Sequence, residues 1–522
     1  MNNNSGQQKR IILAVAISFL FFIFYTEFFV KDNMQTSDID NQTKQNQTIQ
    51  NTIKDNNQQA PITNKNQKLK TLVHINSEHF KAQIDTLGRI SSFILIDNKF
   101  KDQDGKDLEL IQNEDGKPLP LELRFVDELI NNKAFNTSYT SNVSNVNINT
   151  DSKSQIILTQ KLDDIIITKY ITFYNQGNYE IKVEINKKLK YFISPGSRPS
   201  IAVDAYTVHG GLILDNEDTI ETFEDGDVEE NVELNNIYLA SSFDRYYSTL
   251  FYNFSKPLNI FVTKDSKGDT IMYSLVDNEM FEANGYIGAK EYDILYNIDK
   301  RLINAIEYGW FTFIAKPMFV FLKLLYGFLG NWGWSIIVLT IIIRLILFPL
   351  TYKSMISMNK LKELAPKMTE LRQKYKSDPQ KLNIHMMELY KKHGANPFSG
   401  CLPIFLQIPI FFAIYRVLQN AVELKAAPWA LWIHDLSVLD PYYVLPILMG
   451  ATMFLQQVIT PMSIQDPTQA KIMKFLPIVF TFFFLWFPAG LTLYWCVNNI
   501  FSLIQQYIIN KIFAAKKQEI KL

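Results

Sequence analysis

Residues 331–351 read NWGWSIIVLTIIIRLILFPLT, an apolar run interrupted by one charged residue, Arg344. As a helix, residues 334–351 have about the length needed to cross the ~30 Å hydrocarbon core of a bilayer, with Arg344 close to mid-membrane. An arginine at that depth costs about 2.5–3.5 kcal/mol on insertion scales. The stretch therefore predicts a transmembrane helix in which some other part of the protein offsets the cost of a buried charge.

Three ways of offsetting that cost can be compared. An ion pair is disfavoured, because Glu27 and Glu423 lie at the outer ends of their apolar segments and the later apolar segments contain no Asp or Glu. The Arg344 side chain is too short to reach an interface from the midplane without local distortion. The remaining interpretation is a water-filled cavity inside a helical bundle.

Further apolar segments predict the rest of the bundle. Residues 401–422, 443–460 and 491–513 are long enough to span. Residues 475–487 are short, but Pro488-Ala489-Gly490 can turn the chain into the next helix and local bilayer thinning can accommodate a short span. Residues 11–30, preceded by Lys9-Arg10, predict an N-terminal anchor whose start lies in the cytoplasm. The alternative for this anchor, a cleaved signal peptide, fits less well because residues 25–29 are bulky.

Residues 308–329 are also apolar enough to span, so charge must decide their place. If they crossed, the strongly basic stretch 353–400 would lie outside, against the positive-inside rule. We therefore predict that 301–330 forms an amphipathic helix along the outer interface. The resulting topology has six spans, with 1–10 and the basic tail both in the cytoplasm.

The first 300 residues have a different texture. Residues 31–68 are rich in Asn, Gln, Thr and Lys and predict a disordered tether. Residues 69–300 contain short alternating segments, such as Tyr179, Ile181, Val183 and Ile185 between polar neighbours, which predict strands. Asn175-Gln176-Gly177-Asn178 predicts a hairpin turn. Further strands are expected at 80–84, 90–96, 165–174, 246–254, 260–263 and 271–276. This part is expected to be a β-sandwich outside the cytoplasm.

The basic stretch 353–400 predicts a helical hairpin. Its first helix is expected to kink or break near Ala365-Pro366. Asp378-Pro379 is typical of a helix start and Gly394 of a helix end. An ordinary solvated loop and a contact for nucleic acid or an acidic partner both remain possible for this hairpin.

Polar residues in the apolar segments form the candidate binding site. Thr340 lies one turn from Arg344, and Gln407 and Gln456-Gln457 lie in other spans. The last helix carries one stripe of Trp495, Asn499, Ser502 and Gln506, and a neighbouring stripe of Tyr494, Asn498 and Gln505. Hydrogen bonds that hold the bundle together would explain any one of them. Together with a lone arginine, they favour a hydrated groove that holds a polar guest.

Other classes of site find little support. The net charge is zero, and the two cysteines, Cys401 and Cys496, lie in apolar segments without a disulfide or zinc spacing. No nucleophile with an adjacent base, metal-ligand cluster or phosphate loop is present in the bundle sequence. We therefore expect no catalytic residue, no metal and no cofactor.

Several long motifs resemble the YidC/Oxa family of membrane insertases. They are residues 331–337 with Arg344 and 348–351, then NPFSGCLP at 396–403, QIPIF at 407–411, ALWIHDL at 430–436, DPYY at 440–443, LPILMG at 445–450 and FPAGL at 487–491. The layout resembles the Gram-negative bacterial branch. The resemblance implies a five-helix insertase core, 331–522, an N-terminal anchor helix, and a β-supersandwich domain in the periplasm.

The resemblance also implies roles for particular residues and partners. Arg344 would be the groove arginine, with Thr340, Gln407, Gln457 and Gln506 in the polar lining; Trp495 stands where relatives often carry another aromatic residue. Nascent membrane proteins would slide past the third and last spans into the lipid bilayer of the inner membrane. The hairpin 353–400 would contact the ribosome and targeting machinery, and the chain would work alone or with the Sec translocon, as insertase and chaperone.

Two other functions are less well supported. An ion- or solute-coupled transporter would need ionisable residues along a path and would favour a repeated architecture, and the core spans contain no carboxylate. The second is a sugar-binding or sugar-active outer domain; Glu and Asp are plentiful among residues 69–300, but no pair of them stands out.

Overall fold

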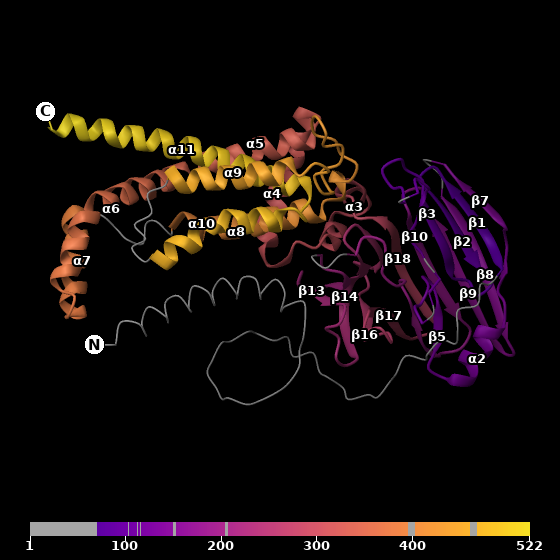
Figure 1. Cartoon of the computed structure of the whole chain (residues 1–522). Helices are drawn as coiled ribbons and strands as arrows, with labels where there is room; N and C mark the ends of the chain where they lie inside the picture. The colour runs from indigo at the N-terminus through magenta and orange to yellow at the C-terminus, as the bar shows by residue number, and fades with distance from the viewer. Residues whose placement is uncertain are drawn as a thin grey trace. The chain divides into compact units, whose positions relative to one another are not determined.

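The computed structural model describes residues 70–102, 104–111, 113–114, 116–149, 153–203, 207–394, 402–459 and 467–521. The predicted anchor, the tether and Cys401 lie outside the described residues. The described chain forms two compact units (Figure 1). The β unit comprises residues 70–309 together with Gln419–Lys425, and the helical unit comprises Trp310–Leu418 and Ala426–Leu522.

The β unit is built almost entirely from short strands joined by turns. The strands are β1 Thr71–Ser77, β2 Phe80–Asp85, β3 Ile90–Leu95, β4 Leu108–Glu109, β5 Leu123–Phe125, β6 Thr140–Ser141, β7 Asn145–Ile148, β8 Ser154–Leu162, β9 Ile165–Phe173, β10 Asn178–Ile185, β11 Lys190–Ile193, β12 Gly210–Asp215, β13 Ile220–Glu224, β14 Val232–Phe243, β15 Tyr247–Tyr252, β16 Leu258–Lys264, β17 Thr270–Asp277 and β18 Met280–Ala289. All the strands predicted from alternation are present, with ends shifted by a few residues.

These strands form two sheets that share one core. The smaller sheet has the order β4-β3-β2-β1-β7, and the larger one runs β5-β11-β17-β16-β14-β15-β18-β10-β9-β8-β6 with β12 and β13 attached at β14. Apolar side chains from both sheets fill the space between them; Phe80 of the small sheet stacks on Phe93 at 4.6 Å and lies 6.3 Å from Phe173 of the large sheet. The predicted sandwich is confirmed.

The hairpin between β9 and β10 forms where the sequence predicts it. The Tyr174 amide donates to the Asn178 carbonyl at 3.0 Å, and Gly177 adopts a positive φ of 86°. A Cβ at Gly177 would lie 2.4 Å from the carbonyl oxygen of Ile287 on β18. Only glycine fits this turn, because both the backbone angle and the close approach exclude a side chain.

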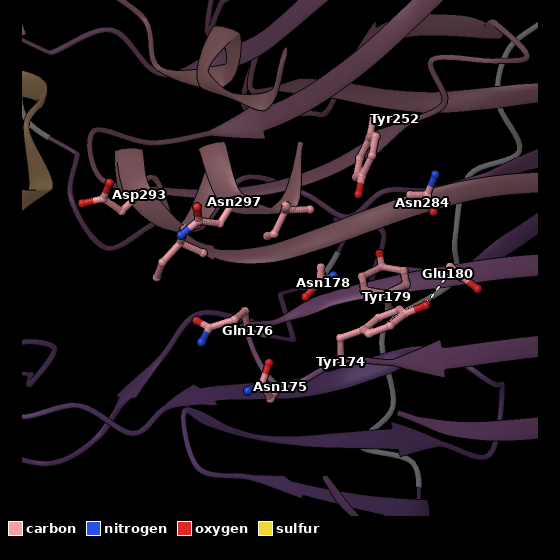
Figure 2. Close-up of a pocket in the computed structure, with 12 residues that line it drawn as sticks. Tyr174, Asn175, Gln176, Asn178, Tyr179, Glu180, Tyr252, Asn284, Asp293 and Asn297 are labelled. Carbon is pink, nitrogen blue, oxygen red and sulfur yellow. Dashed lines mark hydrogen bonds between the residues drawn. The ribbon is translucent and has the colours of Figure 1, made fainter. Parts of the chain in front are cut away.

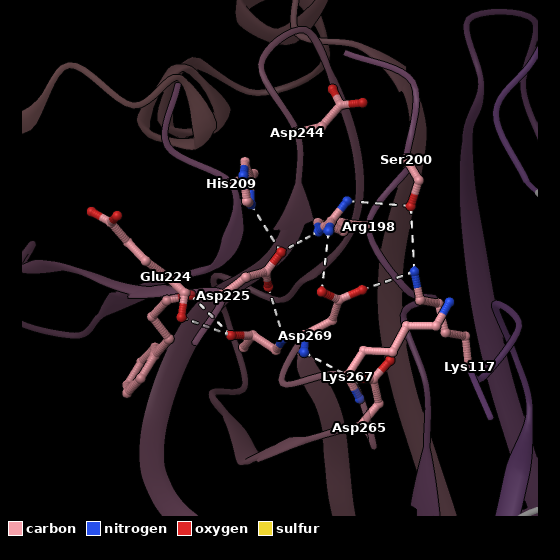
Figure 3. A network of polar contacts seen from close by, with 12 residues as sticks. Lys117, Arg198, Ser200, His209, Glu224, Asp225, Asp244, Asp265, Lys267 and Asp269 are labelled. Atoms are coloured by element: carbon pink, nitrogen blue, oxygen red, sulfur yellow. Dashed lines mark hydrogen bonds and ion pairs between the residues drawn. The ribbon is translucent and has the colours of Figure 1, made fainter. Parts of the chain in front are cut away.

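The β unit contains a network of paired charges. Arg198 forms ion pairs with Asp225 and, at 3.3 Å, with Asp269, while His209 Nδ1 lies 2.9 Å from Asp225 (Figure 3). Lys117 reaches Asp269 at 3.0 Å from a distant loop. This network ties together loops that are far apart in the sequence, so its charges serve the fold.

A short segment at the end of the second predicted core span, Gln419–Lys425, belongs to the β unit. Its polar groups are engaged there: Arg245 Nε donates to the Gln419 carbonyl at 2.7 Å, the Tyr292 amide donates to Glu423 at 2.9 Å, and Lys425 reaches the Tyr247 hydroxyl at 2.8 Å. Burial raises the pKa of Glu423 to about 7. Helix α8 itself ends at Asn420, so the predicted span 401–422 extends two residues past the end of the helix.

The helices lie mainly in the second half of the chain. They are α2 Glu128–Asn136, α3 Tyr292–Ile298, the 3-10 turns η1 Lys300–Ala305, η2 Gly309–Phe311 and η4 Val422–Leu424, and the long helices α4 Thr312–Leu329, α5 Trp332–Ile346, α6 Phe348–Lys374, α7 Pro379–His393, α8 Leu402–Asn420, α9 Val444–Ile459, α10 Pro467–Phe484 and α11 Ala489–Lys521. The long helices build the helical unit, apart from the end of α8.

The helix predicted at 334–351 is bent near its inner end. Helix α5 ends at Ile346, and α6 begins at Phe348 with a bend of 61° between them. Pro349 in the first turn of α6 has no amide hydrogen to continue the α5 ladder but suits a helix start. Arg344 thus lies in the last turn of α5, not at the centre of a straight helix.

Two other helix predictions need correction. Helix α6 is continuous across Pro366, so the break expected there does not occur. Helix α10 begins at Pro467, well before the predicted start at 475. The first turns of α10 are polar, so the apolar run alone does not reveal where the helix begins.

The helical unit displays large apolar side chains on its surface. Phe313, Phe328, Ile346, Val458 and Phe482 are all well over half exposed, as expected for surfaces that face lipid. Among the described residues, Gly309–Leu329 is the helix that meets the length and composition of a span; the bent pair α5–α6 meets them together, and Val444–Ile459 and Lys474–Phe484 are shorter. The interfacial placement of 301–330 stays a prediction from charge.

Candidate functional site

Arg344 is held at the contact between α5 and α11. Its side chain is only 8% exposed; Nε donates to the side-chain oxygen of Asn498 at 2.7 Å and Nη2 to the Asn498 carbonyl at 3.3 Å. Within the described residues it has no carboxylate partner. The charge is therefore solvated by one residue of α11 and is not neutralised.

The α11 stripe that faces Arg344 is the one that the sequence placed second. Gln505, two turns after Asn498, donates from Nε2 to the Arg344 carbonyl at 3.4 Å. Ser502 bonds back to the Asn498 carbonyl at 2.8 Å and is buried. The residues that the structure brings to Arg344 are thus Asn498 and Gln505, both from the second predicted stripe.

The predicted residues Asn499 and Gln506 face elsewhere. Gln506 Nε2 donates to Asn510, which also accepts from Asn359 of α6, both at 2.9 Å. Gln506 therefore belongs to the contact between α11 and α6. Asn499 is buried, and its side-chain nitrogen finds no partner within the described residues.

Trp495 lies in an aromatic cluster between three helices. Its ring meets Phe411 of α8 edge-on at 4.7 Å and Phe484 of α10 at 5.2 Å. The indole Nε1 is buried and makes no hydrogen bond within the described residues. A buried indole donor usually finds a partner, so Trp495 and Asn499 together leave two free donors on one face of α11.

The other predicted lining residues make no hydrogen bond to Arg344 in the described structure. Thr340 is buried, and its hydroxyl donates to the Ile336 carbonyl of its own helix at 2.7 Å. Gln407 on α8 and Gln457 on α9 are half-buried, and neither is hydrogen-bonded to Arg344. In the structure Arg344 is therefore hydrogen-bonded to α11, and the predicted lining residues lie on four different helices.

A guanidinium carries five N–H donors. Asn498 accepts from two of the nitrogens of Arg344, so N–H groups remain for water or for an anionic or polar group of a guest. Charge-assisted hydrogen bonds of this kind are about twice as strong as neutral ones. The arrangement is suited to non-covalent attraction of an acidic group.

The hairpin α6–α7 forms as the capping residues predict. The Asp378 carboxylate accepts from the Lys381 amide, and Gly394 ends α7 in the left-handed conformation. Leu364, Met368 and Met386 form a small core of their own. In Figure 1 the hairpin projects from one end of the helical unit, and its basic side chains are exposed, among them Lys362, Lys367, Arg372 and Lys374.

Comparison with known proteins decides the family. A sequence model described as 60Kd inner membrane protein matches residues 324–517, and one described as YidC periplasmic domain matches residues 264–321. The membrane protein insertase YidC of Campylobacter jejuni is 60% identical, with 98% of each chain covered. The chain belongs to the YidC family of membrane protein insertases.

Other relatives agree. The membrane protein insertase YidC of Helicobacter pylori is 46% identical, covering 99% of this chain and 98% of its own. A crystal structure titled as an active YidC insertase with the first transmembrane domain resolved is 17% identical, with 84% of this chain and 94% of that chain covered and a TM-score of 0.39.

These findings confirm the resemblance, the combination of a helical core with a large β domain, and the insertase function. The YidC insertases are not known as an enzyme family, and the names of these relatives give no support to a transporter. These similarities do not identify which residues contact a substrate.

Proposed function

We propose that this insertase draws the polar or acidic part of a nascent membrane protein toward Arg344 at the junction of α5 and α11. The observation that carries the proposal is a buried guanidinium that has an amide partner, Asn498, and no carboxylate partner in the described structure. A neutralised arginine would gain little from a guest. An arginine that is only solvated by an amide gains a counter-charge when an acidic guest arrives.

The arginine would lower the cost of moving the polar tail of the guest across the membrane. A charged tail carries a large desolvation cost in hydrocarbon, and a cation inside the membrane reduces it. The free donors of Trp495 and Asn499 on the same helix would serve neutral polar groups of the guest. The groove thus shortens the apolar barrier, and no nucleotide hydrolysis is required.

The hydrophobic part of the guest then leaves for lipid. Exposed residues of α10, including Phe475, Ile478 and Phe482, offer an apolar surface beside this route. Transfer of a transmembrane helix into lipid is driven by apolar burial at about 25 cal/mol per Å². Passage past the third and last spans, α8 and α11, is consistent with the aromatic contact that Trp495 makes with Phe411.

The test is insertion into vesicles that contain the purified full chain. Two substrates are compared that differ only in their translocated tail, one with Asp residues and one with Asn in their place, and insertion is scored by protease protection. Arg344→Ala should reduce insertion of the acidic substrate about tenfold, equivalent to about 1.4 kcal/mol, and affect the neutral one less. Arg344→Lys should retain part of the activity because it keeps the charge but cannot make both bonds to Asn498.

Arg301→Ala is the matched control, since Arg301 is an exposed arginine of the β unit paired with Asp299; it should insert both substrates normally. Equal insertion by Arg344→Ala and the unmodified chain, for several substrates of each kind, would refute the role of this arginine.

We further propose that the exposed basic face of α6–α7 contacts the ribosome and targeting machinery, and that the chain works alone or with the Sec translocon in the inner membrane. Replacing Lys362, Lys367, Arg372 and Lys374 by Glu should abolish co-sedimentation with translating ribosomes. It should leave insertion of a substrate released from the ribosome unchanged, because the hairpin core of Leu364, Met368 and Met386 is untouched. Unchanged co-sedimentation would contradict this contact.

The proposed topology has six spans, with both ends in the cytoplasm and residues 69–300 in the periplasm. Single cysteines introduced at Lys376 and Asn132 can be labelled with an impermeant reagent in intact and permeabilised cells. We expect labelling from outside at Asn132 and only after permeabilisation at Lys376. Labelling of Lys376 in intact cells would reverse the orientation of the hairpin.

A further inference from the structure

The β unit carries a pocket of about 490 Å³ that the insertion mechanism does not use (Figure 2). Its volume lies within the range of about 300–1,000 Å³ typical of small-molecule sites. The walls come from the β9–β10 turn, from β15 and β18, and from α3. In Figure 2, Asp293 and Asn297 stand on one side, and Asn175 and Gln176 of the turn lie below them.

The turn that forms one wall is fixed by its backbone. The Gly177 carbonyl accepts from the Ile287 amide at 3.1 Å, and Ser77 Oγ donates to the Asn175 carbonyl at 3.0 Å. Gly177 cannot be replaced by a larger residue without a clash. The side chains of Asn175, Gln176 and Asn178 are therefore presented from a rigid base.

Five carboxamides line the pocket, and turn chemistry explains only three of them. Asn and Gln at positions 175, 176 and 178 suit a hairpin turn. Asn284 lies inside strand β18 and Asn297 inside helix α3, where Asn is disfavoured. None of the five side-chain amides makes a hydrogen bond to another residue that the structure describes. Two independent elements thus bring unused donors and acceptors to the same place.

The remaining lining consists of three tyrosines, two isoleucines and two carboxylates, and it contains no positive charge. The phenol groups of Tyr179 and Tyr252 point toward one another across the pocket (Figure 2). The Tyr179 ring has room because Gly285 lies beneath it; a Cβ there would sit 2.2 Å from Cζ. Burial raises the pKa of both phenols, so they stay protonated. The two carboxylates in the lining, Glu180 and Asp293, disfavour an anionic ligand.

The strands around the pocket have no free edge. Strand β10 is paired with β9 and β18, and β15 with β14 and β18. A peptide could not add as an extra strand here, which is how extended peptides commonly gain backbone hydrogen bonds. Recognition must come from side chains, which suits a compact ligand with hydroxyl groups on several sides.

We propose that this pocket binds a neutral saccharide, with its hydroxyl groups on the carboxamides of Asn284 and Asn297 and on the phenol hydroxyl of Tyr252. Amide groups both donate and accept, as sugar hydroxyls do, and tyrosine combines an apolar ring with a polar tip. The site binds without making or breaking a covalent bond.

The test is calorimetric titration of the full chain in lipid nanodiscs, because maltoside detergents would themselves compete. Maltose and diacetylchitobiose serve as neutral disaccharides, and their tetramers test whether the sugar comes as a free molecule or as the end of a glycan. Glucuronate and an Asn-containing tripeptide serve as the anionic and peptide comparisons. At least one neutral sugar should bind saturably, and glucuronate and the tripeptide should not.

Asn297→Ala and Asn284→Ala should each weaken binding at least fivefold, and Tyr252→Phe about twofold. Asn132→Ala, an exposed helix asparagine of α2 remote from the pocket lining, should not change it. Thermal unfolding identical to the unmodified chain ensures that each variant is folded. Absence of saturable binding by every neutral sugar, tighter binding of glucuronate or the peptide, or equal affinity of Asn297→Ala and Asn132→Ala would overturn the proposal.

Discussion

Two buried arginines, one in each unit, have opposite surroundings. Arg89 of the β unit is 3% exposed and pairs with Asp85 and with Glu122, each at 2.8 Å. Arg344 of the helical unit is 8% exposed and has only Asn498 as its side-chain partner in the described structure. The first charge is neutralised by carboxylates, of which Glu122 is shared with Arg124, and the second is left positive.

The difference separates a structural charge from a functional one. A buried ion pair fixes a conformation, and removal of one partner leaves an uncompensated charge. Hydrogen bonds to a neutral amide hold an arginine in place but do not cancel its positive charge. The β unit uses its cation to hold loops together, whereas the helical unit keeps its cation available for a guest.

The largest expected effect is on Arg89. Arg89→Met leaves Asp85 buried without its ion-pair partner and Glu122 with Arg124 as its partner, and it should lower the free energy of unfolding of the β unit by about 3–5 kcal/mol. Thermal unfolding of the full chain in nanodiscs, followed by protease susceptibility of residues 70–309, measures this. Arg301→Met removes an exposed pair and should cost less than about 1 kcal/mol. Equal losses in the two variants would show that Arg89 is not structural.

A carboxylate in place of the Asn498 amide should give Arg344 a counter-charge, as Arg89 already has. Asn498→Asp is expected to lower insertion of a substrate with an acidic tail about tenfold, while a neutral tail is hardly affected, because the guest must compete with an internal counter-charge. Asn498→Leu removes the hydrogen bond to a charged group and should destabilise the helical unit by about 1.5–3 kcal/mol. Unchanged insertion of the acidic substrate by Asn498→Asp would mean that its negative charge does not meet Arg344.

Acid should lower the stability of the β unit through Asp225. Burial alone would raise the pKa of Asp225, but hydrogen bonds from His209 and the Thr270 amide and the charge of Arg198 lower it below its ordinary value. The unfolded chain, with a pKa of about 3.9, then binds the proton more readily, so this stabilisation is present above about pH 4 and is lost as the pH falls through the lower folded value. The unfolding temperature of the β unit should fall below about pH 4, and that of Asp225→Asn should fall less. An equal fall in both would assign the acid sensitivity to other carboxyls.

The smallest effect is expected at Thr340. Its hydroxyl already donates to the Ile336 carbonyl of its own helix. Thr340→Val therefore removes only a hydrogen bond within α5. Insertion should stay within about twofold of the unmodified chain, and stability within about 0.5 kcal/mol. A loss as large as that of Arg344→Ala would instead place the Thr340 hydroxyl in contact with the guest.

Local patterns predicted much of this molecule. Alternation placed β9 and β10, the sequence Asn-Gln-Gly-Asn placed their turn, and Asp378 and Gly394 placed the ends of α7. Each of these depends on near neighbours in the chain. Apolar length alone missed the early start of α10 and the polar end of α8, because polar residues at helix ends are satisfied by contacts that no local pattern contains.

The sequence by itself determined that a charged residue lies within an apolar helix, that no acid occurs in the later apolar segments, and that the first 300 residues form strands. Tertiary structure alone decided which stripe of α11 meets Arg344. Asn498 and Asn499 are adjacent in the chain and chemically identical, but neighbouring residues on a helix point about 100° apart. The rotation of α11 against α5 therefore selects the partner, and that rotation is set by packing over the whole helical unit.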